Sequence, residues 1–365
     1  MRILLFCLLL FNLCSCKSEE PLKQRNFSEL EIETLLKDSL LNVRALEVDK
    51  SGTGVFATSR GEVGFIYQSK FLNMSYTQEE KLICHIYYEY NYAKDSFPNF
   101  RSVAKNSNSF FAMSIGNPAV VATTSMVNDM HLPDFAYKEI NEKAFYDSMD
   151  FWNDQEGIAI GDPTDDCMSI IITRDGGETW TKLSCDALPK AKEGEAAFAA
   201  SDTNISIVGN QTWVATGGKA SRILYSPDKG KTWDVFETPI VQGKETTGMY
   251  SIDFYDETNG FAIGGDYSKA NDTLNNKIRT KDGGKTWQVV ANGKGPGYRS
   301  CVQYIPNSNA KELVAIGFKG IDYSNDSGET WKHLSDEGFY TIRFLNDSVA
   351  YAAGKGRISK LTFRE

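Results

Sequence analysis

The chain has 365 residues, 41% apolar and 24% charged, which is the composition of a globular protein rather than a disordered one. Its formal charge of −9 argues against a nucleic-acid binder, because phosphate recognition needs a basic surface. The only long apolar run lies at the N-terminus, so we expect no bundle of membrane-spanning helices.

The N-terminus has the features of an export signal. Arg2 precedes about ten apolar residues, too few for a stable membrane anchor. The run ends in Leu13-Cys14-Ser15-Cys16, which resembles a bacterial lipobox with Cys16 as the lipidated residue. We expect a lipoprotein signal peptide over 1–15 and a flexible tether over 16–28, with a plain cleaved signal as the alternative. The following Lys17-Ser-Glu-Glu20 resembles the export tag of Bacteroidetes lipoproteins, so we expect an outer-membrane lipoprotein of the cell envelope, facing the periplasm or the outside.

From residue 43 onward the sequence repeats a strand, a turn and a short apolar strand that mostly ends in glycine. The first strands of these pairs are expected at 45–48, 102–105, 148–151, 197–200, 251–254, 300–303 and 341–344. Seven starts give about 46 residues per unit, the length of a four-stranded propeller blade. Residues 77–98 form an insertion whose structure the sequence leaves open.

Four of these units also contain the pattern [ST]-x-D-x-G-x-T-W, and the tryptophans are 53, 54 and 44 residues apart. In this pattern the Asp accepts backbone N–H groups of a turn, the Gly permits a positive φ and the Trp packs on the neighbouring unit. We therefore assign structural and not catalytic roles to the Asp and Trp of the four boxes: Asp175, Trp180, Asp228, Trp233, Asp282, Trp287, Asp326 and Trp331.

The last unit, 340–365, has room for only three strands. Residues 29–36 alternate like a strand, although their Leu and Glu also favour a helix. We expect them to pair with 357–363 and close the ring, because a sheet edge would otherwise stay open.

Cys167 and Cys185 flank one predicted pair of strands, so they are either bridged in an oxidising compartment or buried as free thiols. With three histidines and no C-x-x-C, we expect no metal and no cofactor.

The boxes and the strands Gly157-Ile-Ala-Ile-Gly161 and Gly260-Phe-Ala-Ile-Gly264 resemble the Asp-box propellers typified by the photosystem II assembly factor. Sortilin-type and sialidase propellers share the box. The resemblance covers residues 43–365 and implies an all-β, seven-bladed β-propeller of four-stranded antiparallel blades, closed by the N-terminal strand, over 29–365. In the resembled assembly factors a basic patch on the propeller holds a partner polypeptide.

The resemblance also implies that ligands bind on the face opposite the boxes. The candidate residues at this channel mouth precede the inner strands or lie beside them: Arg44, Arg101, Asp147, Glu195, Tyr250, Arg299, Tyr340 and Asp162. Three equivalent arginines would offer paired N–H donors to a carboxylate or phosphate, unless the neighbouring acids neutralise them. We expect a monomeric, non-catalytic binding or assembly scaffold that recognises an acidic or carboxylate-bearing protein or peptide, and no nucleic acid.

The alternative is a sialidase-like glycoside hydrolase with the same arginines, Tyr250 or Tyr340, Glu195 and Asp162 in catalytic roles. The order and spacing of these residues differ from the sialidase pattern, and Phe100-Arg101-Ser102-Val103 only echoes the arginine motif of that family. We therefore favour the hypothesis that the protein is not an enzyme. A purely structural module of an envelope complex is the third possibility.

Overall fold

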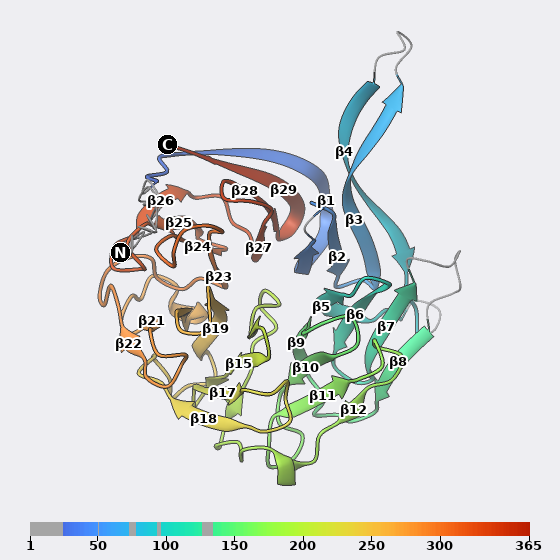
Figure 1. The fold of residues 1–365 in the computed structure, drawn as a ribbon, viewed down its shortest axis with the longest axis vertical. Helices are drawn as coiled ribbons and strands as arrows, with labels where there is room; N and C mark the ends of the chain where they lie inside the picture. Colours follow the sequence, from blue (N-terminus) through green and yellow to red (C-terminus); the bar gives the residue numbers. More distant parts are fainter. Residues whose placement is uncertain (1–24, 50, 73–77, 93–95, 126–133) are drawn as a thin grey trace, which may run out of the picture.

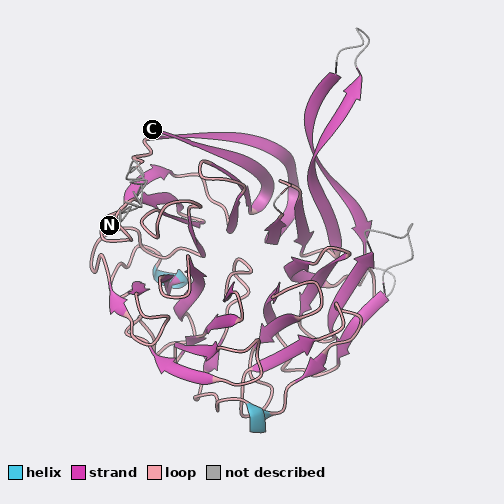
Figure 2. Ribbon diagram, viewed as in Figure 1, coloured by secondary structure: helices cyan, strands magenta, loops and turns pink. Residues whose placement is uncertain are grey.

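The computed structural model describes residues 25–49, 51–72, 78–92, 96–125 and 134–365. These residues form antiparallel strands and two short 3-10 helices, η1 (Cys185–Ala187) and η2 (Tyr267–Lys269). The sheets are placed around a central axis, the arrangement of a β-propeller (Figure 1, Figure 2). No helix in the described part of the chain is long and apolar enough to cross a membrane.

Four sheets in the described residues have four strands each. They consist of β5 (Asn99–Lys105), β6 (Ser109–Ile115), β7 (Ala119–Ser125) and β8 (Asp134–Glu139); β9 (Tyr146–Phe151), β10 (Gly157–Gly161), β11 (Ser169–Thr173) and β12 (Thr181–Lys182); β14 (Ile205–Val208), β15 (Gln211–Ala215), β17 (Arg222–Ser226) and β18 (Asp234–Glu237); and β23 (Cys301–Tyr304), β24 (Leu313–Gly317), β25 (Gly320–Ser324) and β26 (Lys332–Ser335). A further blade contains β19 (Thr247–Phe254), β20 (Gly260–Asp266), β21 (Lys277–Thr280) and β22 (Gln288–Val289), joined to the short pair β13 (Glu195–Ala196) and β16 (Gly217–Gly218).

The remaining sheet holds two blades that share the long strand β1 (Glu29–Val48). One blade is β27 (Thr341–Phe344), β28 (Val349–Ala353), β29 (Lys355–Arg364) and the first half of β1. The other is the second half of β1 with β2 (Gly54–Thr58), β3 (Glu62–Leu72) and β4 (Gln78–Glu89), whose outer hairpin projects from the disc (Figure 1).

The first half of β1 closes the ring as expected. Leu30 lies opposite Phe363 and Lys37 opposite Arg357. Leu30 and Ile32 pack on the core between the last blades while the glutamates on either side of each are exposed, the alternation of a strand rather than a helix. The predicted all-β propeller of four-stranded antiparallel blades, closed by an N-terminal strand, is confirmed.

The expected signal peptide and most of the expected tether, including Cys16, lie outside the described residues. The part of the tether that is described packs on the propeller. Phe27 is buried, with ring centroids 5.1 Å from Tyr323 and 5.6 Å from Phe363, and Arg25 donates to Glu312 over 2.8 Å.

The Asp boxes form the turns between the third and fourth strands of their blades. In one of them, Asp282 accepts both the N–H (2.9 Å) and the hydroxyl (2.6 Å) of Thr286. Gly284 has a φ of +84°, and a Cβ at this position would lie 2.9 Å from Nε1 of Trp213 in the preceding blade. The corresponding glycines of the other boxes approach Phe111, Ile172 and Phe261 equally closely. Each box therefore sets the spacing to the preceding blade as well as the turn.

One expected inner strand is wrong. Residues 197–200 form no strand, and the inner strand of that blade is β14, which begins at Ile205.

Upstream, Cys167 and Cys185 are joined by a disulfide with their Cα atoms 5.4 Å apart. It links the loop after β10 to η1 and so holds the segment that leads toward the centre of the ring.

Candidate functional site

Residues 197–204, the central segment, occupy the middle of the ring. The segment hydrogen-bonds to the inner strand, or the residue preceding it, in every blade other than its own: β1, β5, β9, β19, β23 and β27. Among these bonds, Thr341 donates its hydroxyl to the Ser201 carbonyl (2.8 Å) and the Ile252 N–H donates to the Thr203 carbonyl (2.8 Å). The central segment therefore separates two cavities, one at the expected mouth and one on the side of the Asp boxes.

The mouth cavity has a volume of about 400 Å³. Its floor is the central segment and its walls are mainly aromatic: Phe145, Phe198, Tyr250, Tyr267, Tyr298, Phe318 and Tyr340. Phe198 stacks on Tyr250 with centroids 3.9 Å apart, and Tyr250 meets Tyr298 edge-on at 4.8 Å. Four of the eight predicted mouth residues line this cavity, namely Arg44, Arg101, Tyr250 and Tyr340.

Arg44 is held between the central segment and an aromatic ring. It donates to the Ala200 carbonyl over 3.0 Å, and its guanidinium lies 3.8 Å from the centroid of Tyr340. Its Nε is buried and has no hydrogen-bond partner among the described residues. Burial lowers the pKa of this guanidinium below its usual value. The geometry leaves Arg44 with an unused donor beside the cavity.

Arg101 is held in a similar way. It donates to Asn99 Oδ1 (3.1 Å) and to the Ala199 carbonyl (3.1 Å). Burial and then the charge of Arg44 lower the pKa of Arg101 to about 10, so it remains protonated at neutral pH. Neither arginine forms an ion pair with any described residue. Two partly desolvated positive charges without a carboxylate partner favour an incoming anion.

Arg299, the third predicted arginine, does not line the cavity. The carboxylate of Asp322 on β25 pairs with its Nε (2.7 Å) and Nη2 (2.5 Å), and both side chains are buried. The expected convergence therefore brings together two arginines rather than three. The neutralising acids expected from the sequence lie beside the inner strands, whereas this acid comes from the third strand of the same blade.

None of the three predicted acids of the mouth lines the mouth cavity. Glu195 forms a bidentate pair with Arg222 (3.0 and 2.6 Å) and is closed to solvent, so it is not placed for the role of a glycosidase carboxylate. Asp162 accepts the N–H of Ala197 (2.7 Å), and burial raises its pKa to about 6. Asp147 is fully buried, and burial followed by the charge of Asp162 raises its pKa well above the usual range.

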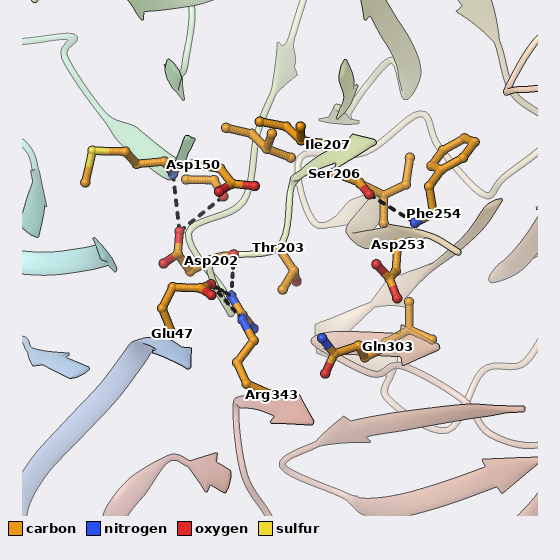
Figure 3. Close-up of a pocket in the computed structure, with 15 residues that line it drawn as sticks. Glu47, Asp150, Asp202, Thr203, Ser206, Ile207, Asp253, Phe254, Gln303 and Arg343 are labelled. Carbon is orange, nitrogen blue, oxygen red and sulfur yellow. Dashed lines mark hydrogen bonds and ion pairs between the residues drawn. The ribbon is translucent and has the colours of Figure 1, made fainter. Parts of the chain in front are cut away.

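The inner cavity, on the other side of the central segment, has a volume of about 180 Å³ (Figure 3). Arg343 projects into it, bonded to Glu47 (2.7 Å) and to the Asp202 carbonyl (2.9 Å). Asp150 and Asp253 also line the inner cavity. In Figure 3, Asp150 lies near Asp202 and Asp253 lies near Gln303. Sequence reasoning did not identify this ring of charges. The sequence does contain a pattern that could have indicated it. The third residue of four expected inner strands is charged: Glu47, Asp150, Asp253 and Arg343.

The inner cavity should make stability depend on pH. Burial and then the charge of Glu47 raise the pKa of Asp150 to about 7, and burial raises that of Asp253 to about 6. Because an unfolded Asp titrates near about 4, the unfolded state releases these protons first, and stability falls as pH rises from about 4 to about 7. We expect Asp150→Asn to melt a few degrees above the wild type at pH 8 and at nearly the same temperature at pH 4. Parallel melting curves across this pH range would contradict the assignment.

No protein-family model matches the chain, and no curated protein matches it. Among solved structures it is similar to YCF48 bound to D1 peptide, with a TM-score of 0.59, 12% identity, and coverage of 93% of this chain and 99% of that one. It is also similar to the WD40 propeller domain of Doa1 (TM-score 0.59, 14% identity, 93% and 98% coverage) and to YCF48 from Cyanidioschyzon merolae (0.57, 12%, 92% and 99%). At such identities the likeness shows the fold alone, and the chain is a β-propeller.

Proposed function

We propose that this protein is a non-catalytic binding scaffold that captures a polypeptide partner through a carboxylate at the mouth cavity. The observation that carries the proposal is the pair Arg44 and Arg101, which line an aromatic cavity and form no ion pair with a described residue. A ligand carboxylate would supply the missing counter-charge, and its apolar neighbour would pack on the tyrosines. The peptide complex of the similar propeller YCF48 supports a polypeptide as the ligand class.

The test uses N-acetylphenylalanine, a small probe that has both a carboxylate and an aromatic side chain. Its amide is the control without the negative charge. Saturation-transfer NMR with the wild type should show the acid binding and the amide binding at least about tenfold more weakly, because a charge-assisted pair is lost. Arg44→Gln with Arg101→Gln should remove the preference for the acid. Arg60→Gln, an exposed arginine outside the cavity, is the matched control. Equal binding of acid and amide by the wild type would refute carboxylate capture, provided that thermal unfolding shows the variants are folded.

We further propose that the propeller is an exported lipoprotein attached to a membrane of the cell envelope through Cys16. The lipobox-like Leu13-Cys14-Ser15-Cys16 supports this. In cells fed a labelled fatty acid, the wild type should take up label and sediment with membranes, whereas Cys16→Ala should do neither. Cys14→Ala is the control for the neighbouring cysteine. Label in Cys16→Ala would place the acylation elsewhere, and unlabelled wild type would favour a plain cleaved signal.

A further inference from the structure

A second hollow, here called the outer groove, adjoins the mouth cavity. It has a volume of about 410 Å³ and is lined by residues 267–272 together with Phe318 and Lys319. Tyr267 and Phe318 line both hollows and are among the most exposed large apolar side chains of the described residues. Exposed aromatic residues that border a cavity are typical of interaction surfaces. The two hollows therefore form one continuous path from the arginines outward.

The outer groove is built on a well-supported loop. Asp266 caps η2 by accepting the N–H (2.9 Å) and hydroxyl (2.6 Å) of Ser268. The Tyr298 N–H donates to the Ala270 carbonyl (3.0 Å), and a Cβ on Gly297 would lie only 2.2 Å from the same oxygen. Beneath the loop, the buried Lys277 donates to the carbonyls of Lys294 (2.9 Å) and Pro296 (2.7 Å). This network holds the groove in one shape before any partner binds.

The charges around the mouth cavity differ between its two sides. On the outer groove, Lys269 and Lys319 are exposed and form no ion pair with a described residue, and Asp272 is the one carboxylate among the residues lining it. On the other side, a third hollow begins at Asp162, whose N–H donates to the Phe145 carbonyl of the mouth cavity (2.7 Å). That hollow is lined by Lys143 and Lys192, by the carboxylates Asp162, Asp165, Asp166 and Glu193, and by Glu195, whose charge Arg222 neutralises. An acidic chain leaving the mouth is attracted to one side and repelled from the other.

We infer that the partner is an extended polypeptide segment whose carboxylate lies on Arg44 and Arg101 and whose chain leaves between Tyr267 and Phe318. Its acidic side chains, a few residues from the buried carboxylate, then lie along Lys269 and Lys319. The inference rests on the proposed function, since it needs the carboxylate at the mouth. It adds a direction for the bound chain and an acidic sequence preference. The formal charge of −9 on the propeller itself argues against a second copy of this chain as the acidic partner.

The probes are two fluorescein-labelled hexapeptides with free carboxylates, Glu-Asp-Glu-Ala-Ala-Phe and its neutral counterpart Gln-Asn-Gln-Ala-Ala-Phe. Fluorescence anisotropy at low ionic strength should show the acidic peptide binding about tenfold tighter to the wild type, a difference that added salt removes. Lys269→Glu with Lys319→Glu should abolish this difference while the neutral peptide binds as before. Lys143→Glu, on the acidic side of the mouth, is the matched control and should keep the difference.

The outcomes separate the two proposals. If the wild type bound both peptides equally and Arg44→Gln with Arg101→Gln still abolished that binding, the role of the outer groove would be overturned. Carboxylate capture at the mouth would then stand. A preference lost in Lys143→Glu but kept in the double lysine variant would overturn the direction of the chain. Binding of neither peptide to the wild type, together with no response to the acid probe, would overturn both. Because Lys143, Lys269 and Lys319 are all exposed, the folded state should tolerate these substitutions.

Discussion

Asp202→Ala is expected to lower the free energy of unfolding by about 3 kcal/mol or more, because it leaves buried donors of two blades without an acceptor. Asp202 accepts the N–H of Val103 (2.8 Å), the N–H of Met149 (3.3 Å) and the hydroxyl of Ser148 (3.2 Å). Its backbone has a φ of 60°, a conformation that costs alanine about 1 kcal/mol more than residues suited to it. Chemical denaturation of the two proteins measures the difference.

The same substitution should weaken capture of N-acetylphenylalanine. The carbonyls of Ala199 and Ala200 that hold the two arginines belong to the segment that Asp202 anchors. Asp202→Asn is the matched comparison, because Asn tolerates a positive φ and keeps one of the two acceptor oxygens, so it can accept from Val103 or from Met149 and Ser148 but not from all three. Burial also raises the pKa of Asp202 well above its usual range, so the loss of the negative charge in Asn should matter less than the loss of an acceptor oxygen. The Asn variant should lose less than the Ala variant, and an Ala variant that captured the probe as well as the wild type would show that the site does not depend on the hydrogen bonds from Val103 and Met149.

Trp213→Ala is expected to cost about 3–5 kcal/mol, the range for removal of a large buried aromatic side chain. Trp213 is fully buried on β15 and stacks on Phe254 of the next blade with centroids 3.7 Å apart. Its Nε1 donates to the Gly283 carbonyl of the neighbouring Asp box over 2.8 Å. The variant therefore loses packing and leaves a box carbonyl unpaired at one inter-blade contact.

Two comparisons make this second experiment specific. Trp213→Phe keeps most of the ring contact and loses the hydrogen bond, so its cost should be about 1–2 kcal/mol. Trp233→Ala removes the tryptophan of a box itself, which is only half-buried, and should cost less than Trp213→Ala. If Trp233→Ala proved the more damaging of the two, the box would depend on its own tryptophan rather than on its contact with the preceding blade.

The closing strand shows why much of the fold could be predicted. Residues 29–36 begin with alternating acidic and apolar side chains, a period that fits one buried face of a sheet, and the last unit lacked a strand. The boxes are equally local, since Asp282 bonds only to residues within four positions of itself. Patterns that are satisfied within a few residues, or by a repeat of themselves, can be read directly from the chain.

The central segment shows the limit. Ala197-Phe-Ala-Ala200 is apolar and lies where the repeat leads one to expect an inner strand, although Ile205–Val208 has the composition more typical of strands. What separates them is the set of hydrogen bonds that the inner strands of the other blades direct at residues 197–204. Those partners lie up to 156 positions away, as for Arg44 and Ala200, so no local pattern records them.

Unaided, the sequence determined the repeat, its turns, the closing strand and four of the residues at the mouth, because each depends on neighbours in the chain or on equivalent positions in the repeat. The charge state of the site depended on contacts across the folded ring. Arg299 pairs with Asp322 on another strand, and Glu195 pairs with Arg222. Arg44 and Arg101 hydrogen-bond only to carbonyls and an amide. The disulfide between Cys167 and Cys185 likewise depended on a Cα separation of 5.4 Å. Coulomb interactions and covalent bridges act over a few ångströms in space, whatever the separation in sequence, so only the packed ring could assign them.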